Sequence, residues 1–235
     1  MSENYSSQQK ELVKQLEAFF AGNTNKSMVA EVVEVQDDYV KNKRICLTSV
    51  VFPPAEITAK ITTEIIDKLR AINPEQYFLP PESIHLTIKN IRTISDPPSF
   101  TAEDIVKVNK LFSELIPQYP SFEFKVEDVV LFPTSVSVMA YSDDSLQKLV
   151  LALDQGLKEI GLPDDKKYFS DSVFWGNITL CRFTKTPSEK FIAEVKKMRD
   201  LKIGKFQLEK VNLITGNAAC YAGLRKIHGE YELKR

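Results

Sequence analysis

Histidine, tryptophan and cysteine are scarce in this 235-residue chain. It has two histidines, His85 and His228, one tryptophan, Trp175, and three cysteines. No cysteine follows another at the spacing of metal ligands, which argues against a zinc site. The cysteines are odd in number and lie in apolar stretches, so we expect free buried thiols in a reducing compartment. We therefore expect a cytoplasmic protein.

Long apolar runs and a strong charge of one sign are also absent. No stretch reaches the ~18 apolar residues of a membrane span, so no membrane association is expected. The first residues, MSENYSSQQKELVKQ, are polar and lack the apolar core of a signal peptide. The formal net charge of −1 argues against a broad electrostatic grip on nucleic acid. The 31 Lys and Arg residues still leave room for a local basic groove.

Hydrophobic spacing predicts an α+β fold in the remainder of the chain. Residues 1–43 read as an N-terminal helical extension, with a helix at 7–20, and residues 44–235 as the main domain. The predicted strands are 44–52, 83–91, 122–132, 135–141, 173–183, 205–215, 217–224 and 231–233. The predicted helices are 57–72, a segment from Thr101 to Pro117 with a capping box, a segment from Asp143 or Asp144 to Gly161, and a segment from an N-cap at Thr186 to Met198.

The two halves of this domain resemble each other in sequence. FKVEDVVLF at 124–132 aligns with FQLEKVNLI at 206–214 at an offset of 82 residues, and SIHLTIKNI at 83–91 aligns with WGNITLCRF at 175–183 at an offset of 92. Chance similarity between amphipathic strands is the alternative. Because two segments match in the same order, we expect two similar lobes of antiparallel sheet with helices outside. A pseudo-two-fold axis should relate the lobes, and a cleft should lie between them.

The second aligned pair carries two short polar motifs. One places His85 two residues before Thr87, and the other places Asn177 two residues before Thr179. On a strand, residues i and i+2 point to the same face. Two such strands side by side would form a small polar site on an apolar floor. A histidine can exchange protons near neutral pH, whereas an asparagine cannot.

These motifs, their spacing and the lobe repeat resemble the 2H phosphoesterase superfamily, which includes 2′-5′ RNA ligase-like proteins and cyclic nucleotide phosphodiesterases. Members carry two His-x-Thr/Ser motifs in two similar lobes. The first motif is matched in full by His85-Leu86-Thr87-Ile88, and the second by Thr179-Leu180 and by Arg182, where members often carry a basic residue. The chain departs from the pattern at Asn177, where the family has its second histidine. The resemblance covers about residues 44–233.

The resemblance implies roles for individual residues. His85, Thr87 and Thr179 would be catalytic: the histidine would transfer a proton and the hydroxyls would hold a phosphate, with no metal and no cofactor. Asn177 and Arg182 would contact the substrate. Trp175 is a further candidate for substrate binding by stacking on a base, and Tyr221 for lining the cleft. The alternatives are a core histidine, a solvent-facing arginine and aromatic side chains that belong to the core.

The expected function is therefore binding of, or action on, RNA termini or 2′,3′-cyclic or 2′-5′ phosphodiesters. Activity should be reduced because Asn177 replaces a catalytic histidine. An active protein would be a metal-independent cyclic phosphodiesterase or 2′-5′ RNA ligase-like enzyme. The alternatives are a module that senses a small phosphorylated ligand without turnover, and a scaffold that binds a protein partner through its cleft or residues 1–43.

Overall fold

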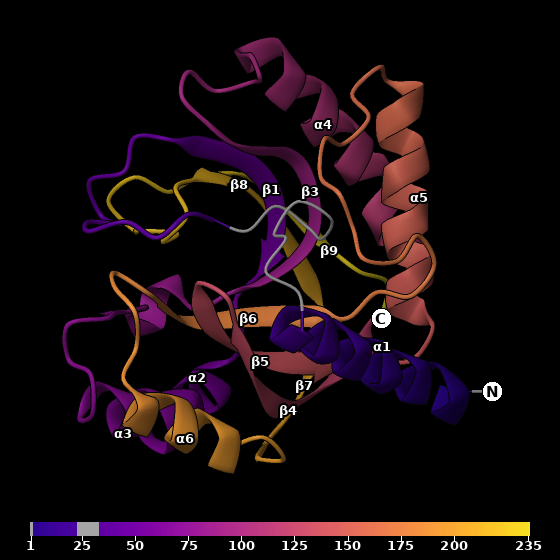
Figure 1. Ribbon diagram of the computed structural model, residues 1–235. Helices are drawn as coiled ribbons and strands as arrows, with labels where there is room; N and C mark the ends of the chain where they lie inside the picture. The colour runs from indigo at the N-terminus through magenta and orange to yellow at the C-terminus, as the bar shows by residue number, and fades with distance from the viewer. Residues whose placement is uncertain (1, 23–32) are drawn as a thin grey trace.

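A single antiparallel sheet organises the chain, with most helices packed on its outer face (Figure 1). The computed structural model describes residues 2–22 and 33–235. The strands are β1 (Ile45–Val51), β2 (Tyr77–Phe78), β3 (Leu86–Ser95), β4 (Phe122–Phe132), β5 (Ser135–Tyr141), β6 (Gly176–Arg182), β7 (Lys202–Leu208), β8 (Lys210–Gly216) and β9 (Lys226–Glu232). The α-helices are α1 (Ser2–Gly22), α2 (Ala55–Ile61), α3 (Asp67–Arg70), α4 (Ala102–Leu115), α5 (Ser145–Glu159) and α6 (Glu189–Lys197). A π-helical segment, Thr62–Ile66, joins α2 to α3, and 3₁₀ turns span Pro81–Ser83 and Ile116–Gln118.

The strand order β7-β4-β5-β6-β3-β1-β8-β9 confirms the two similar lobes. One lobe contains β3, β1, β8 and β9, and the other contains β6, β5, β4 and β7. The lobes meet where β3 pairs with β6, through the single residue pair Leu86 and Ile178. The pseudo-two-fold passes through this pair and exchanges the two motif strands. The lobe of β3 and β1 is completed by the C-terminal end of the chain, because β8 and β9 return to pair beside β1.

The pseudo-symmetry extends to an irregularity in each motif strand. On β3, Thr87 pairs with Val50 and Lys89 pairs with Ser49. Ser49 and Val50 are consecutive on β1, so Ile88 between Thr87 and Lys89 is an extra residue without a partner on β1. The same irregularity occurs on β6 immediately after its own threonine. Such β-bulges change which face the following side chains reach. Their matching positions support the repeat independently of residue identity.

The two faces of the sheet are packed by different helices. Along β5, Val136, Val138 and Ala140 point to the main core. The alternate residues Met139 and Tyr141 form a second cluster on the inner face. Helices α2 and α6 contact β7 and β4, and α4 and α5 contact β9 and β3, so they cover the outer face of the two lobes. Helix α1 packs on the inner face and crosses β5 in Figure 1.

Several element boundaries agree with the sequence prediction. Strands β4 and β5 span the predicted 122–132 and 135–141. The capping box of α4 is confirmed, because the Thr101 side chain accepts a hydrogen bond from Asp104 N and the Asp104 carboxylate accepts one from Thr101 N. The N-terminal helix extends beyond its predicted range of 7–20 and reaches from Ser2 to Gly22.

Three local predictions were wrong. The predicted strand at 205–215 is two strands, β7 and β8, separated at Glu209, and they belong to different lobes. The predicted strand at 217–224 is a turn region, and β8 pairs instead with β9. The N-cap of α6 is Ser188 rather than Thr186, because the Ser188 hydroxyl accepts the hydrogen bond from Phe191 N.

None of the helices described here is long and apolar enough to cross a membrane. Within residues 2–22 and 33–235, no three His, Cys, Asp or Glu side chains gather as metal ligands.

Candidate functional site

Both polar motifs line one cavity on the inner face of the sheet, with a volume of about 300 Å³. Its polar wall contains His85, Thr87, Asn177, Thr179 and Arg182. The apolar and aromatic residues of its lining are Leu16, Phe20, Val33, Ile88, Phe132, Pro133, Leu146, Val150, Tyr168, Phe169, Val173, Phe174 and Trp175. A concave, mostly apolar cavity with a few convergent polar groups is typical of a small-molecule site.

The pairing of β3 with β6 determines how the four motif side chains meet. Leu86 and Ile178 are direct partners and point to the core. In an antiparallel pair, the residues on either side of these partners are opposite one another. His85 therefore lies across from Thr179, and Thr87 across from Asn177. Opposite side chains are roughly 4.5–5.5 Å apart at Cβ, so all four can contact one small anion.

Gly176 permits this close approach of the two motif strands. A Cβ atom at Gly176 would lie 2.3 Å from Leu86 Cδ1 and 2.9 Å from the Ala140 Cβ. Any other residue would therefore displace Leu86, which fixes the register between the motifs. The glycine directly before the second motif thus has a packing role.

The bulge on β6 turns Arg182 toward the cavity. Ser137 pairs with Thr179 and Val136 with Cys181, so one extra residue lies between the two pairs. Arg182 is three positions after Thr179, so on a regular strand the two side chains would point to opposite faces. The extra residue in the bulge brings them to the same face. Its Nε donates a 2.7 Å hydrogen bond to the Ala218 carbonyl. Its guanidinium carbon lies 6.0 Å from the centre of the Tyr39 ring.

Burial lowers the pKa of Arg182 from its ordinary value, with Tyr39 and the nearby cysteines opposing the shift. A guanidinium nevertheless stays protonated under all practical conditions. Arg182 therefore supplies a fixed positive charge beside the two threonine hydroxyls, as anion binding requires.

His85 is oriented by contacts with the 3₁₀ turn before it and with the turn after β8. Its Nδ1 lies 2.7 Å from the Ser83 carbonyl, and because that oxygen can only accept, Nδ1 carries the proton. Ser83 Oγ in turn donates to the Cys220 carbonyl at 3.0 Å. Burial acts to lower the pKa of His85, but the Cys220 thiol and the hydrogen bonds to Cys220 and Ser83 outweigh this, so the pKa is raised above its usual value.

Cys220 is the thiol partner of this imidazole. It is buried, and its backbone φ of 48° places it in the left-handed region. Burial acts to raise the pKa of the thiol, but His85 and then Arg225 lower it, and the net shift is downward. Arg225 Nη1 lies 3.7 Å from Cys220 Sγ. The shifts of both groups stabilise a charged imidazole in the site.

The pKa values of the two histidines provide the first testable prediction. His85 should titrate above the usual value near 6.5, whereas His228 should titrate below it because of burial and Lys226. The substitution Cys220→Ala should lower the pKa of His85 and leave that of His228 unchanged. NMR titration of the two imidazole Cε1–H resonances measures both values in one sample. A wild-type His85 that titrates below His228 would contradict the assigned environment.

The sign of the pH effect on stability follows from the same shift. Because the pKa of His85 is raised by folding, its contribution to the free energy of unfolding is fully present below about pH 6.5. That contribution is lost as the pH rises through the folded-state pKa. Anion binding at His85 should weaken over the same interval.

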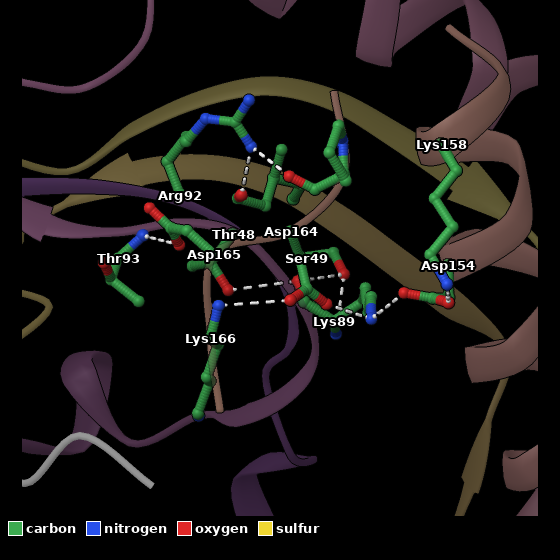
Figure 2. Close-up of polar contacts among 12 residues, drawn as sticks. Thr48, Ser49, Lys89, Arg92, Thr93, Asp154, Lys158, Asp164, Asp165 and Lys166 are labelled. Carbon is green, nitrogen blue, oxygen red and sulfur yellow. Dashed lines mark hydrogen bonds and ion pairs between the residues drawn. The ribbon is translucent and has the colours of Figure 1, made fainter. Parts of the chain in front are cut away.

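A polar network fixes the loop between α5 and β6, which supplies much of the cavity wall (Figure 2). Arg92 Nη1 donates to the Pro163 carbonyl at 2.7 Å, and Thr93 N donates to Asp165 Oδ1 at 2.7 Å. Buried Lys89 forms ion pairs with Asp154, at 2.9 Å, and with Asp164. The loop is therefore tied to β3, the strand that carries the first motif.

Of the two aromatic candidates for the site, only one lines the cavity. Trp175 lines the cavity, half-buried against the inner cluster. Tyr221 is exposed and lies outside the cavity lining, packed against Gly223. His228 lies on β9, with Nε2 2.9 Å from Thr215 Oγ1, and is also outside the lining, so it does not take the place of a second motif histidine.

Some cavity residues were not anticipated from the sequence. Leu16, Phe20 and Val33 come from the segment interpreted as an extension. Lys166 and Phe169 come from the loop before β6. The sequence feature that could have indicated them is the pair of adjacent phenylalanines, Phe19 and Phe20, at the end of a predicted helix. Two large apolar side chains side by side favour a buried helix end over an exposed one.

No family model matches this sequence, and a search of curated proteins also gives no match. Solved structures do match. A phosphoesterase superposes with a TM-score of 0.58 and 16% identity, covering 82% of this chain and all of the other. TT0787 of Thermus thermophilus gives 0.57 and 17%, over 80% and 98%. E. coli LigT in complex with 3′-AMP gives 0.57 and 15%, over 82% and 100%.

These structures share the fold over their whole length while sharing little sequence. LigT has also been solved in complex with NADP+, ATP and phosphate. The match confirms the two-lobed α+β fold that the resemblance predicted. This chain therefore has the fold of the LigT-like 2H phosphoesterases.

Proposed function

We propose that this protein binds small phosphodiesters or phosphomonoesters of nucleosides, such as a 2′,3′-cyclic nucleotide, and cleaves them weakly. The observation that carries the proposal is the meeting of His85, Thr87, Thr179 and Arg182 in one cavity. Hydroxyl and guanidinium donors bind phosphate oxygens, and the histidine can exchange a proton with a reacting oxygen. The LigT structures with nucleotides and phosphate support the choice of ligand.

The arrangement accounts for one of the two proton transfers that phosphodiester cleavage uses. The Ser83 carbonyl holds Nδ1–H of His85, so the other ring nitrogen, Nε2, would accept or donate a proton at the reacting oxygen. On the opposite side of the phosphate, Asn177 can donate a hydrogen bond but cannot titrate. Turnover would then depend on water for the second proton, which reduces the rate.

A sensing role without turnover is the second candidate, and Asn177 is the observation that favours it. An amide keeps hydrogen-bond donation to a phosphate and removes proton transfer. RNA termini fit the same phosphate chemistry. A protein-binding role through α1 has less support, because α1 buries Val13 and Leu16 against its own chain.

Ligand binding should depend on the motif residues. We expect 2′,3′-cyclic AMP and inorganic phosphate to stabilise the wild-type protein against heat, by mass action. The substitutions His85→Ala and Thr179→Val should each weaken binding about 10- to 100-fold, since a hydrogen bond to a charged group contributes roughly 1.5–3 kcal/mol. Isothermal titration calorimetry measures the affinities, and thermal shift follows the stabilisation.

Thr63→Val is the matched control for Thr179→Val, because Thr63 is exposed on the outer helix and lies outside this cavity. It should bind like wild type. If wild type binds neither probe, or if His85→Ala and Thr179→Val bind as tightly as Thr63→Val, the phosphate site is refuted. Binding without measurable product would select the sensing role.

A further inference from the structure

The N-terminal helix α1 forms part of the cavity wall. Leu16 and Phe20 line the cavity, and Val33 joins them. The superposed LigT chain is covered completely by 82% of this chain. The remaining 18% of this chain has no counterpart in LigT. Residues 1–43 make up about 18% of the 235 residues, so this segment equals the unmatched part of the chain in size.

Polar contacts fix α1 against the segment that leads into the second motif. Gln9 is fully buried: its Nε2 donates to the Phe174 carbonyl at 2.5 Å, and its Oε1 accepts from Ser142 N at 3.1 Å. Phe174 N also donates to the Tyr5 hydroxyl at 2.9 Å. Phe174 precedes Trp175 and lies three residues before Asn177. Helix α1 therefore holds the backbone that leads into the second motif.

Ion pairs and apolar packing continue this contact along the helix. Lys10 Nζ lies 2.6 Å from Glu127, and Glu17 lies 2.6 Å from Arg199. Between them, Val13 is fully buried in the inner cluster against which Trp175 packs. Contacts on three successive turns fix the helix in rotation and in position. The residues at its C-terminal end consequently have defined places in the cavity.

Two adjacent phenylalanines at that end reach different walls. The Phe20 ring lies 6.0 Å from the Phe132 ring at 87°, an edge-to-face contact with the end of β4. The Phe19 ring lies 6.5 Å from the Phe169 ring, which belongs to the loop before β6. Edge-to-face and tilted arrangements are favourable for aromatic pairs. The end of α1 thus contacts both Phe132 and Phe169, two aromatic residues of the cavity lining.

We propose that α1 makes Leu16 and Phe20 specificity-determining residues, and that they select phosphoesters carrying one flat, base-sized aromatic group. The inference rests on the proposed function. The polar wall would hold the phosphate, and the aromatic group would lie among Phe20, Phe132 and Trp175. Stacking on an aromatic side chain contributes to the binding of any base, so it is tolerant of base identity. A volume of about 300 Å³ is at the lower end of ligand sites, which suits a single nucleoside unit.

Two probes separate the phosphate wall from the aromatic wall. Inorganic phosphate can use only the polar residues, whereas 2′,3′-cyclic AMP can use both walls. Phe20→Ala and Leu16→Ala should leave the affinity for phosphate within about twofold of wild type. The same variants should weaken 2′,3′-cyclic AMP binding by about tenfold or more, in line with the stacking contribution of roughly 1–3 kcal/mol per base. Ribose 5-phosphate, which lacks a base, should be insensitive to both substitutions.

The chain offers an internal reporter and a matched control. Trp175 is its one tryptophan and lines the cavity, so its fluorescence should change with nucleotide and report the affinity directly. Lys14→Ala alters an exposed position of the same helix and should bind all three probes like wild type. Circular dichroism of each variant establishes that α1 remains folded.

The outcomes distinguish the two proposals. Loss of nucleotide affinity in Phe20→Ala with phosphate affinity retained supports the role of α1. Equal nucleotide affinity in Phe20→Ala, Leu16→Ala and Lys14→Ala overturns it and leaves the phosphate site intact. If wild type binds none of the probes, the proposed function itself fails.

Discussion

Asn177→His should increase the rate of 2′,3′-cyclic nucleotide cleavage by about 10²- to 10⁴-fold, the range that a positioned acid or base contributes. This corresponds to about 3–5 kcal/mol of activation free energy. The reason is geometric. Asn177 is exposed and lies across the Leu86–Ile178 pair from the first motif, in the position related by the pseudo-two-fold to His85. A histidine there would face the phosphate from the side opposite His85.

Two controls make the rate increase interpretable. Asn177→Ala removes the amide without adding a titratable group and should stay as slow as wild type. The double variant with His85→Ala and Asn177→His should lose most of the gain, because the new histidine would then lack its partner. A bell-shaped pH dependence of kcat/KM should appear only in Asn177→His. An inert Asn177→His protein that still binds nucleotide would show that the cavity cannot orient a second base.

Lys89→Met should destabilise the fold by about 3–5 kcal/mol, the range for removing one partner of a buried ion pair. The Lys89 side chain is 2% exposed and that of Asp164 is 8% exposed, so neither member of this pair is well hydrated. Lys89 Nζ also lies 4.9 Å from the centre of the Tyr168 ring. With methionine at position 89, Asp164 would remain buried without its cation, and desolvation of that charge is costly.

Urea denaturation measures this effect through the free energy of unfolding. Lys158→Met is the matched control, because Lys158 pairs with Asp154 at 2.7 Å while its side chain is 57% exposed. Exposed pairs contribute about 0–1 kcal/mol, so this variant should change little. Adding Asp164→Asn to Lys89→Met should recover part of the loss. Equal losses in the two lysine variants would show that Lys89 is not held as an essential buried cation.

Loss of the Lys89 cation should also affect the cavity. The network in Figure 2 ties the loop after α5 to β3, and that loop contributes Lys166, Tyr168 and Phe169 to the cavity. Lys89→Met should therefore weaken nucleotide binding at temperatures where the protein is still folded. Nothing in the sequence around Lys89 marks it as a buried structural cation.

Much of the fold was predictable because it depends on local patterns. Alternation along 122–132 and 135–141 and the capping box at Thr101 follow from residues close together in the chain. The error at 205–215 has the opposite origin. Its apolar alternation shifts phase at Glu209, from Phe206 and Leu208 to Val211 and Leu213, but only the pairing of β7 and β8 with strands of different lobes shows that the strand breaks there.

The sequence by itself determined which residues are candidates for the chemistry. Spacing of two on a strand places His85 with Thr87, and Asn177 with Thr179, because side-chain direction alternates along any extended backbone. The repeat between the two motifs also followed from the sequence, since related strands keep the same order of apolar and polar positions. That the side chain of Asn177 cannot titrate is a matter of residue identity alone.

Only the tertiary structure decided what surrounds those residues. A β-bulge, visible only in the pairing of β5 with β6, turns Arg182 into the cavity. Contacts between residues more than 130 positions apart place Gln9 against Phe174 and Ser142, and so bring Phe20 to the aromatic wall. Local periodicity carries no information on such contacts, because their free energy depends on packing between segments that meet only after the chain has folded.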